Sequence, residues 1–149
     1  MVMRIEDVLE MWKEDAQIDE LRLDDVSREC ANLHAKYLEM LSTAKLQLKR
    51  RESEYKILLK NKWLWYNGKM TKDKMDELGW DYDPLGGLRV QKSDMDYFYD
   101  SDEDIQNMKM KIEYLKELVS TLEEIISNIR FRPNNIRNII EWKKFTSGV

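Results

Sequence analysis

Apolar residues recur every three or four positions through most of this chain, which is the spacing of one face of an α-helix. The spacing predicts a short amphipathic helix over residues 3–15 and a much longer one from Leu23 to the stop signal Asn67-Gly68. Neither Gly nor Pro interrupts this long segment before Gly68. The simplest interpretation is one amphipathic helix of about forty residues, a length typical of coiled coils and extended bundles.

The segment between residues 68 and 100 has a different pattern. A short helix is predicted from Thr71 to Leu78, and the run 83–87 contains the Pro and Gly residues of a turn. Apolar and polar residues then alternate over 88–91 and again over 95–99. The middle of the chain is therefore expected to be a small irregular insert or a β-hairpin.

The most regular helical pattern follows this insert. Ser101 and Asp104 resemble a capping box that opens a helix, and Arg132-Pro133 is expected to break it before a last helix over 134–145. Ten apolar positions between these signals form a predicted seam: Ile105, Met108, Ile112, Leu115, Leu118, Val119, Leu122, Ile125, Ile126 and Ile129. Their heptad spacing predicts C-terminal coiled-coil helices, and the width of the seam suits a higher oligomer or a bundle core. We assign the seam to the oligomer interface, and the fold class is mainly α.

Composition removes several classes of protein. One His and one Cys in 149 residues leave almost no material for a metal site or a His-based catalytic triad. We therefore expect no enzyme activity, no metal and no cofactor. No apolar run approaches the roughly 20 residues that a membrane-spanning helix requires, so no such helix is expected, and we name no membrane among the partners.

The net charge of −4 conceals strong segregation of charge along the chain. Residues 1–44 carry a net charge of −6, residues 45–74 of +7, residues 75–104 of −8 and residues 105–149 of +3. Such blocks indicate surfaces with different partners, although solvated helix faces would give the same pattern. The acidic stretch 94–104 could mimic nucleic acid, contact the basic block or bind a basic partner, or it could be a solvated loop.

The basic block has the geometry of a nucleic-acid site. On a helix, Lys45, Lys49, Lys56 and Lys60 project within about 60° of one another, and such a row can follow a phosphate backbone. Lys62 falls inside the apolar stripe, where it either extends out to solvent or faces a second surface. Aromatic side chains between these cations can stack on unpaired bases. The candidate DNA-binding residues are Lys45, Lys49, Lys56, Lys60, Lys62, Trp63, Trp65 and Tyr66. Packing against a protein partner explains the same features, and a membrane surface is a third, weaker alternative.

Three short motifs resemble the UvsY-type recombination mediator family of T-even-like bacteriophages. Residues 3–8 are similar to the first residues of the family. Residues 59–62, followed by 65–68, resemble its Leu-Lys-x-Arg signature with the aromatic pair and Gly that come after it. Residues 136–145 resemble its closing helix. Lys62 stands where the family has Arg, which keeps the charge but loses the planar fork that grips phosphate.

The resemblance implies a ring-like homo-oligomer, a hexamer or heptamer, that binds single-stranded DNA. It further implies a protein that helps load a RecA-like recombinase onto strands coated by single-stranded-DNA-binding protein. By the same resemblance, Lys60 and Lys62 occupy the DNA-contact positions, and the protein is a phage protein of the host-cell cytoplasm. We therefore divide the chain into a DNA-binding helical region with an acidic loop, residues 1–100, and oligomerisation helices, residues 101–149. The alternative function is a structural coiled-coil adaptor whose basic helix binds protein.

Overall fold

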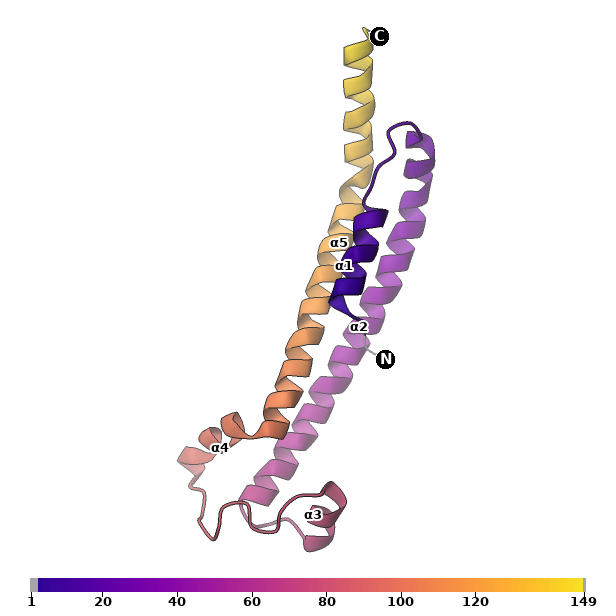
Figure 1. Ribbon diagram of the computed structural model, residues 1–149. Helices are drawn as coiled ribbons and strands as arrows, with labels where there is room; N and C mark the ends of the chain where they lie inside the picture. Colours follow the sequence, from indigo (N-terminus) through magenta and orange to yellow (C-terminus); the bar gives the residue numbers. More distant parts are fainter. Residues whose placement is uncertain (1–2, 149) are drawn as a thin grey trace. The chain divides into compact units, whose positions relative to one another are not determined.

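The structure, a computed structural model, describes residues 3–148 and consists of helices joined by irregular connections (Figure 1). No strand occurs in that part of the chain, so the mainly α prediction is confirmed. In chain order the elements are α1 (Ile5–Asp15), α2 (Leu23–Tyr66), α3 (Lys72–Leu78), the 3-10 turn η1 (Lys92–Asp94), α4 (Met95–Ser101) and α5 (Glu103–Ser147).

The long helix α2 and the short helix α3 have the predicted bounds, and local residues explain their ends. Gly68, just after α2, has a φ of +67°, a left-handed conformation that side-chain-bearing residues rarely adopt. At the start of α3, the hydroxyl of Thr71 accepts a hydrogen bond from the backbone N–H of Lys74 at 3.2 Å. Such a cap satisfies one of the unpaired donors of the first turn.

Of the two alternatives expected for the middle of the chain, the irregular insert is confirmed and the hairpin is not. Residues 88–91 are irregular, and the segment expected to be its second strand is the helix α4. Met95 is buried, and Phe98 and Tyr99 are half-buried. These three apolar residues stand at the i, i+3, i+4 spacing of a helix as well as in a partly alternating run, so the short pattern was ambiguous.

The start of α5 also differs from the predicted capping box. Ser101 is the last residue of α4, and its hydroxyl donates a hydrogen bond to the carbonyl oxygen of Tyr97 at 2.8 Å. Asp102 caps α5 instead, because its Oδ1 accepts from the backbone N–H of Ile105 at 3.0 Å. The cap residue therefore lies one position further along the chain than predicted.

Pro133 does not break α5, which continues through it to Ser147. A proline inside a helix removes one backbone hydrogen bond and crowds the carbonyl of the preceding turn. Arg132 and Ile136, on either side of it, are both buried. We attribute the continuity of the helix to this packing, which holds both flanking turns in place.

The chain forms two compact units, and both long helices contribute to each of them. Unit 1 joins the chain up to Gln47 with the chain from Leu115 onward, and unit 2 is Leu48–Tyr114. The structural boundaries therefore cross the sequence boundary at residue 100. The assignment of DNA binding to residues 1–100 and of oligomerisation to residues 101–149 stays a prediction.

In unit 1, α1 lies along the first half of α2 and the second half of α5 (Figure 1). Val8 of α1 and Tyr37 of α2 are completely buried, and the ring of Trp12 meets that of Tyr37 edge-on, with centroids 5.6 Å apart. Asp15, the last residue of α1, accepts hydrogen bonds from Tyr37 Oη at 2.7 Å and Lys36 Nζ at 2.6 Å. These contacts fix the short helix on the two long ones.

The predicted intersubunit seam is a core within the chain itself. Two of its members, Met108 and Val119, are half-buried. The other eight are buried: Ile105, Ile112, Leu115, Leu118, Leu122, Ile125, Ile126 and Ile129. Side chains already enclosed by their own chain cannot cover a neighbouring subunit, which corrects the assignment of this seam to the oligomer interface. The heptad spacing was identified correctly, but within each unit the helices of the same chain supply its partner.

Candidate nucleic-acid interface

The lysine row, Lys45, Lys49, Lys56 and Lys60, lies on the exposed side of α2. Within the described chain, no ion-pair partner is present for the last three of these residues, all of which belong to unit 2. Lys45 belongs to unit 1, and its Nζ lies 3.6 Å from Glu123 Oε1. Both of those side chains are half exposed, and exposed pairs of this kind contribute little to stability.

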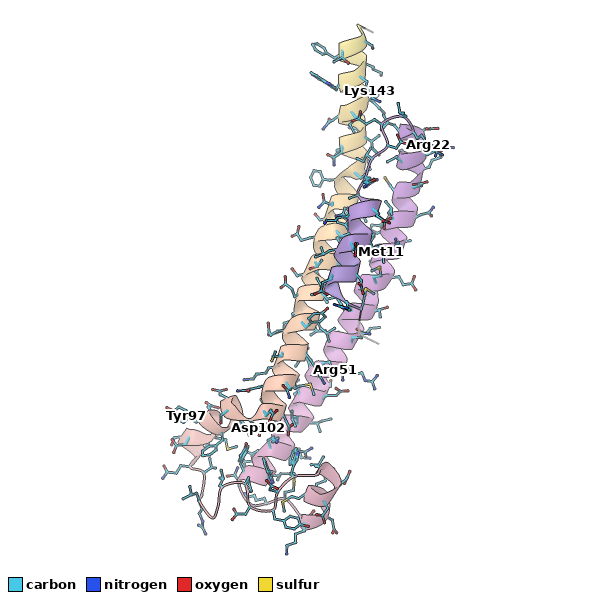
Figure 2. The ribbon with its side chains drawn as sticks, viewed as in Figure 1. Met11, Arg22, Arg51, Tyr97, Asp102 and Lys143 are labelled. Carbon is cyan, nitrogen blue, oxygen red and sulfur yellow. The ribbon has the colours of Figure 1, made fainter. Side chains whose placement is uncertain are left out.

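The arginines next to the lysine row share one carboxylate. Arg50 and Arg51 both pair with Glu54, at 3.5 Å and 2.7 Å. The hydrogen bond from Arg51 is the main reason that the pKa of Glu54 lies below its ordinary value. Arg51, marked in Figure 2, is thus held by its own helix, whereas Lys49, Lys56 and Lys60 have no ion-pair partner among the described residues.

The three predicted stacking residues have different environments. Trp63 is 40% exposed, projects on the same side of α2 as the lysine row, and has the ammonium of Lys69 4.7 Å from its ring centroid. Trp65 and Tyr66 are half-buried, with ring centroids 4.9 Å apart. The indole N–H of Trp65 donates to the carbonyl oxygen of Asp81 at 2.6 Å. Trp63 is therefore the most accessible of the three rings.

Lys62 is the predicted contact that the structure places differently from the others. The residue is only 2% exposed, and its Nζ lies 2.8 Å from Asp104 Oδ2 and 3.1 Å from Asp102 Oδ2. The same ammonium lies 4.4 Å and 4.0 Å from the ring centroids of Trp65 and Trp80. We name these five residues the Lys62 cluster. In this conformation the Lys62 ammonium does not reach the surface of unit 2, where a phosphate would have to meet it.

Asp102, labelled in Figure 2, is the buried carboxylate of the Lys62 cluster. Burial by itself would raise its pKa, but hydrogen bonds from Tyr66, from the backbone N–H of Ile105 and from Lys62 outweigh burial and lower the pKa. The phenol of Tyr66 donates to Asp102 Oδ2 at 2.6 Å, and burial together with this bond raises the pKa of Tyr66. Asp102 is therefore held as a carboxylate that caps α5 and neutralises Lys62.

Sequence reasoning missed the carboxylates and the second indole of this cluster. A lysine within an apolar helical stripe signals a buried partner, because an unpaired ammonium is costly to bury. Nothing in the spacing showed that the partner lay some forty residues away on another helix. The acidic stretch 94–104, whose role was left open, supplies that partner through Asp102 and Asp104.

No group of three or more potential metal ligands occurs among residues 3–148. Within the same described range, no helix is long and apolar enough to cross a lipid bilayer. The arrangement of chemical groups is thus a row of cations beside an exposed indole.

Unbalanced lysines with a neighbouring aromatic ring are typical of proteins that bind single-stranded nucleic acid without sequence preference. A sequence profile described as "Recombination, repair and ssDNA binding protein UvsY" matches residues 11–149. The chain belongs to this UvsY family of recombination, repair and single-stranded-DNA-binding proteins.

Individual relatives agree with this assignment. The chain is 27% identical over 146 residues to the recombination protein uvsY of Enterobacteria phage T4, covering 98% of this chain and 99% of that protein. It is also similar to a crystal structure of the bacteriophage T4 recombination mediator protein UvsY, lattice type II. That match has a TM-score of 0.83 and 25% identity, over 98% of this chain and 99% of the other. In lattice type I the TM-score is 0.81, with 24% identity over 94% and 98% of the two chains.

Proposed function

We propose that this protein is a recombination mediator that acts without catalysis. It binds single-stranded DNA as a homo-oligomer and helps load a RecA-like recombinase onto strands coated by single-stranded-DNA-binding protein, in the cytoplasm of the phage-infected host cell. The single observation that carries the proposal is the lysine row in a fold like that of a T4 recombination mediator, because three of its four lysines have no ion-pair partner among the described residues. Lys45, Lys49, Lys56 and Lys60 contact phosphates, and Trp63 stacks on a base.

Three predicted contacts stand apart from the surface along the lysine row. Lys62, Trp65 and Tyr66 are engaged in or beside the Lys62 cluster, and they hold the end of α2 in position. The lysine row and Trp63 then remain as the surface on which the phosphates of the strand lie. This division separates phosphate contact from support of the fold.

Assembly multiplies a weak site. A few lysines on one subunit bind a strand weakly at physiological salt, because counterions compete for the phosphates. Several such sites linked in one particle act at high effective concentration and can add roughly 10²–10⁴ in avidity. The mediator can favour the recombinase over the coating protein only if its affinity differs between the two states of the DNA, the strand bound by the recombinase and the strand covered by the coating protein.

Salt-dependent retention on immobilised single-stranded DNA tests the proposed function. We expect the protein to be retained at low salt and to elute as salt rises. Binding releases cations from the DNA phosphates, and this release favours binding less as the salt concentration increases. We expect immobilised duplex DNA to retain it less, since paired bases offer no open face to Trp63. A coiled-coil adaptor would pass through both columns, and that result would overturn the proposal.

The end of α5 is the surface that we propose for self-association. Trp142 and Phe145 are exposed there, with ring centroids 5.8 Å apart in a stacked arrangement. Phe131, about three turns earlier on the same side of the helix, is exposed as well. Exposed apolar side chains grouped in this way are typical of interaction sites, and the family resemblance leads us to expect a hexamer or heptamer.

The double variant Trp142→Ser, Phe145→Ser is expected to reduce the mass of the particle in light scattering, because it removes most of the apolar area at this surface. Circular dichroism should show unchanged helix content, since neither ring is buried within the chain. Leu21→Ser provides the control, because Leu21 is also an exposed apolar residue of unit 1. A double variant of unchanged mass would exclude this surface as the interface.

A further inference from the structure

Unit 2 contains a cavity that the lysine row and the Lys62 cluster do not account for. Its volume is about 430 Å³, and its walls include Trp65, Tyr66, Asn67, Tyr82, Leu88 and Arg89. This volume lies within the range of pockets that hold small organic molecules. The cavity therefore has room for a flat heterocycle, and Trp65, Tyr66 and Tyr82 supply the aromatic part of a wall that also includes Asp83.

Two large side chains with apolar surface, Tyr82 and Leu88, are exposed at the rim of the cavity. Tyr82 is 57% exposed and Leu88 is 76% exposed. Local bonds shape the loop that presents them, since the backbone N–H of Gly87 donates to Asp83 Oδ1 at 3.0 Å. The hydroxyl of Tyr82 is hydrogen-bonded to Asp76. The rim is thus an organised surface that would gain by covering an apolar ring face.

The lysine row leads to the mouth of this cavity. The backbone N–H of Asn67 still donates to the carbonyl oxygen of Trp63 at 3.1 Å, so helical geometry persists as far as Asn67. By that geometry Asn67 projects within about 60° of the lysine row and lies ~10 Å beyond Lys60 along the axis. A strand whose phosphates lie along the row therefore arrives where Asn67 and Gly68 line the cavity.

Polar groups at the cavity suit the edge of a base and its phosphate. The side-chain N–H of Asn67 donates to the carbonyl oxygen of Trp63 at 2.7 Å, which leaves its amide oxygen able to accept. Arg89 lines the cavity and has no ion-pair partner among the described residues. An amide oxygen can accept from a base N–H, and a guanidinium can meet the phosphate that follows.

We propose that this cavity takes one unpaired nucleobase of the strand that lies along the lysine row. The inference deepens the proposed function and depends on it. The base enters between Tyr82 and Leu88, lies against the aromatic wall and leaves its phosphate near Arg89. The site would fix the register of the strand, whereas the lysine row supplies affinity that is independent of sequence.

The test compares two oligonucleotides with the same number of phosphates, oligo(dT) and an abasic strand of equal length. Fluorescence anisotropy should show tighter binding of oligo(dT) to the unmodified protein. The variant Tyr82→Ala, Leu88→Ala should bind oligo(dT) about five-fold more weakly, a loss at the lower end of stacking contributions. Its affinity for the abasic strand and its dependence on salt should not change, because the phosphate contacts remain.

Leu21→Ala provides the matched control, because it shortens an exposed leucine of unit 1 outside the cavity. Two results with the double variant would contradict the proposed base-binding cavity and leave the proposed function intact. One is an equal loss of affinity for oligo(dT) and for the abasic strand, and the other is an undiminished preference for oligo(dT). Failure of the unmodified protein to bind either strand would overturn both.

Photo-crosslinking gives an independent measurement on the unmodified protein. An oligonucleotide carrying 5-iododeoxyuridine should crosslink to the peptide that contains Tyr82, which lines the cavity and is separate from the peptide that carries Trp63. Crosslinks confined to peptides outside the segment 75–90 would contradict the pocket.

Discussion

Lys62→Ala is expected to lower the free energy of unfolding by about 3–5 kcal/mol, the cost of removing one partner from a buried ion pair. The variant leaves Asp102 enclosed without the ammonium that neutralises it, and it removes the cation that lies beside the rings of both Trp65 and Trp80. Urea denaturation followed by circular dichroism measures this loss. Lys60→Ala, an exposed replacement two residues away, should change the same quantity by only about 0.5 kcal/mol.

The same two variants separate support of the fold from contact with DNA. Under conditions where both variants are folded, Lys60→Ala should reduce the slope of log K against log salt by about 0.7, the value for one phosphate contact on a single strand. Lys62→Ala should leave that slope unchanged, because its ammonium is held by Asp102 and Asp104. A reduced slope for Lys62→Ala would show that the ammonium leaves its cluster to meet phosphate, as the family resemblance implied.

Asp102→Asn supplies a further check on the Lys62 cluster. The amide keeps the shape of the side chain and can still accept a hydrogen bond, but it removes the charge that balances Lys62. We expect a loss of stability similar in kind to that of Lys62→Ala, with the salt slope again unchanged. A variant as stable as the unmodified protein would show that Asp104 alone is sufficient for Lys62.

The helices were predictable where the signal was local. The bounds of α2 follow from an uninterrupted apolar spacing and the stop at Asn67-Gly68, and those of α3 follow from the cap at Thr71. The lysine row was predictable for the same reason, since the angular spacing of residues on a helix depends on sequence alone. Local rules therefore gave both the scaffold and the surface that we propose to bind DNA.

Features that depend on tertiary contacts were not predictable. An apolar spacing of three and four shows that a helix has a partner, but not whether that partner is another subunit or the same chain, and so the seam was misassigned. Pro133 is normally a break, yet the buried residues on either side of it keep α5 continuous. Lys62 was placed correctly in the apolar stripe, but its carboxylates lie on a distant segment.

Removing the charge of the lysine row is expected to have the largest effect on DNA binding. Replacing Lys45, Lys49, Lys56 and Lys60 with glutamine should lower the slope of log K against log salt by about 2.8 for each subunit engaged, at about 0.7 per contact. If the variant and the unmodified protein bind DNA equally in 1 M salt, this difference in slope corresponds to a ~10²–10³-fold lower affinity of the variant at 0.1 M salt. Fluorescence anisotropy over a salt series measures both quantities.

A second quadruple variant controls for the change in net charge. It replaces four other exposed lysines with glutamine: Lys13, Lys109, Lys111 and Lys116. If only the total charge attracts DNA, the two variants should lose affinity equally, because each carries four fewer positive charges. If the lysine row is the contact surface, the control should keep most of the slope, since distant exposed charges are screened beyond about 10 Å at 0.1 M salt. Light scattering on both variants should give the mass of the unmodified particle, so that a loss of binding reports on the row itself and not on a change in assembly.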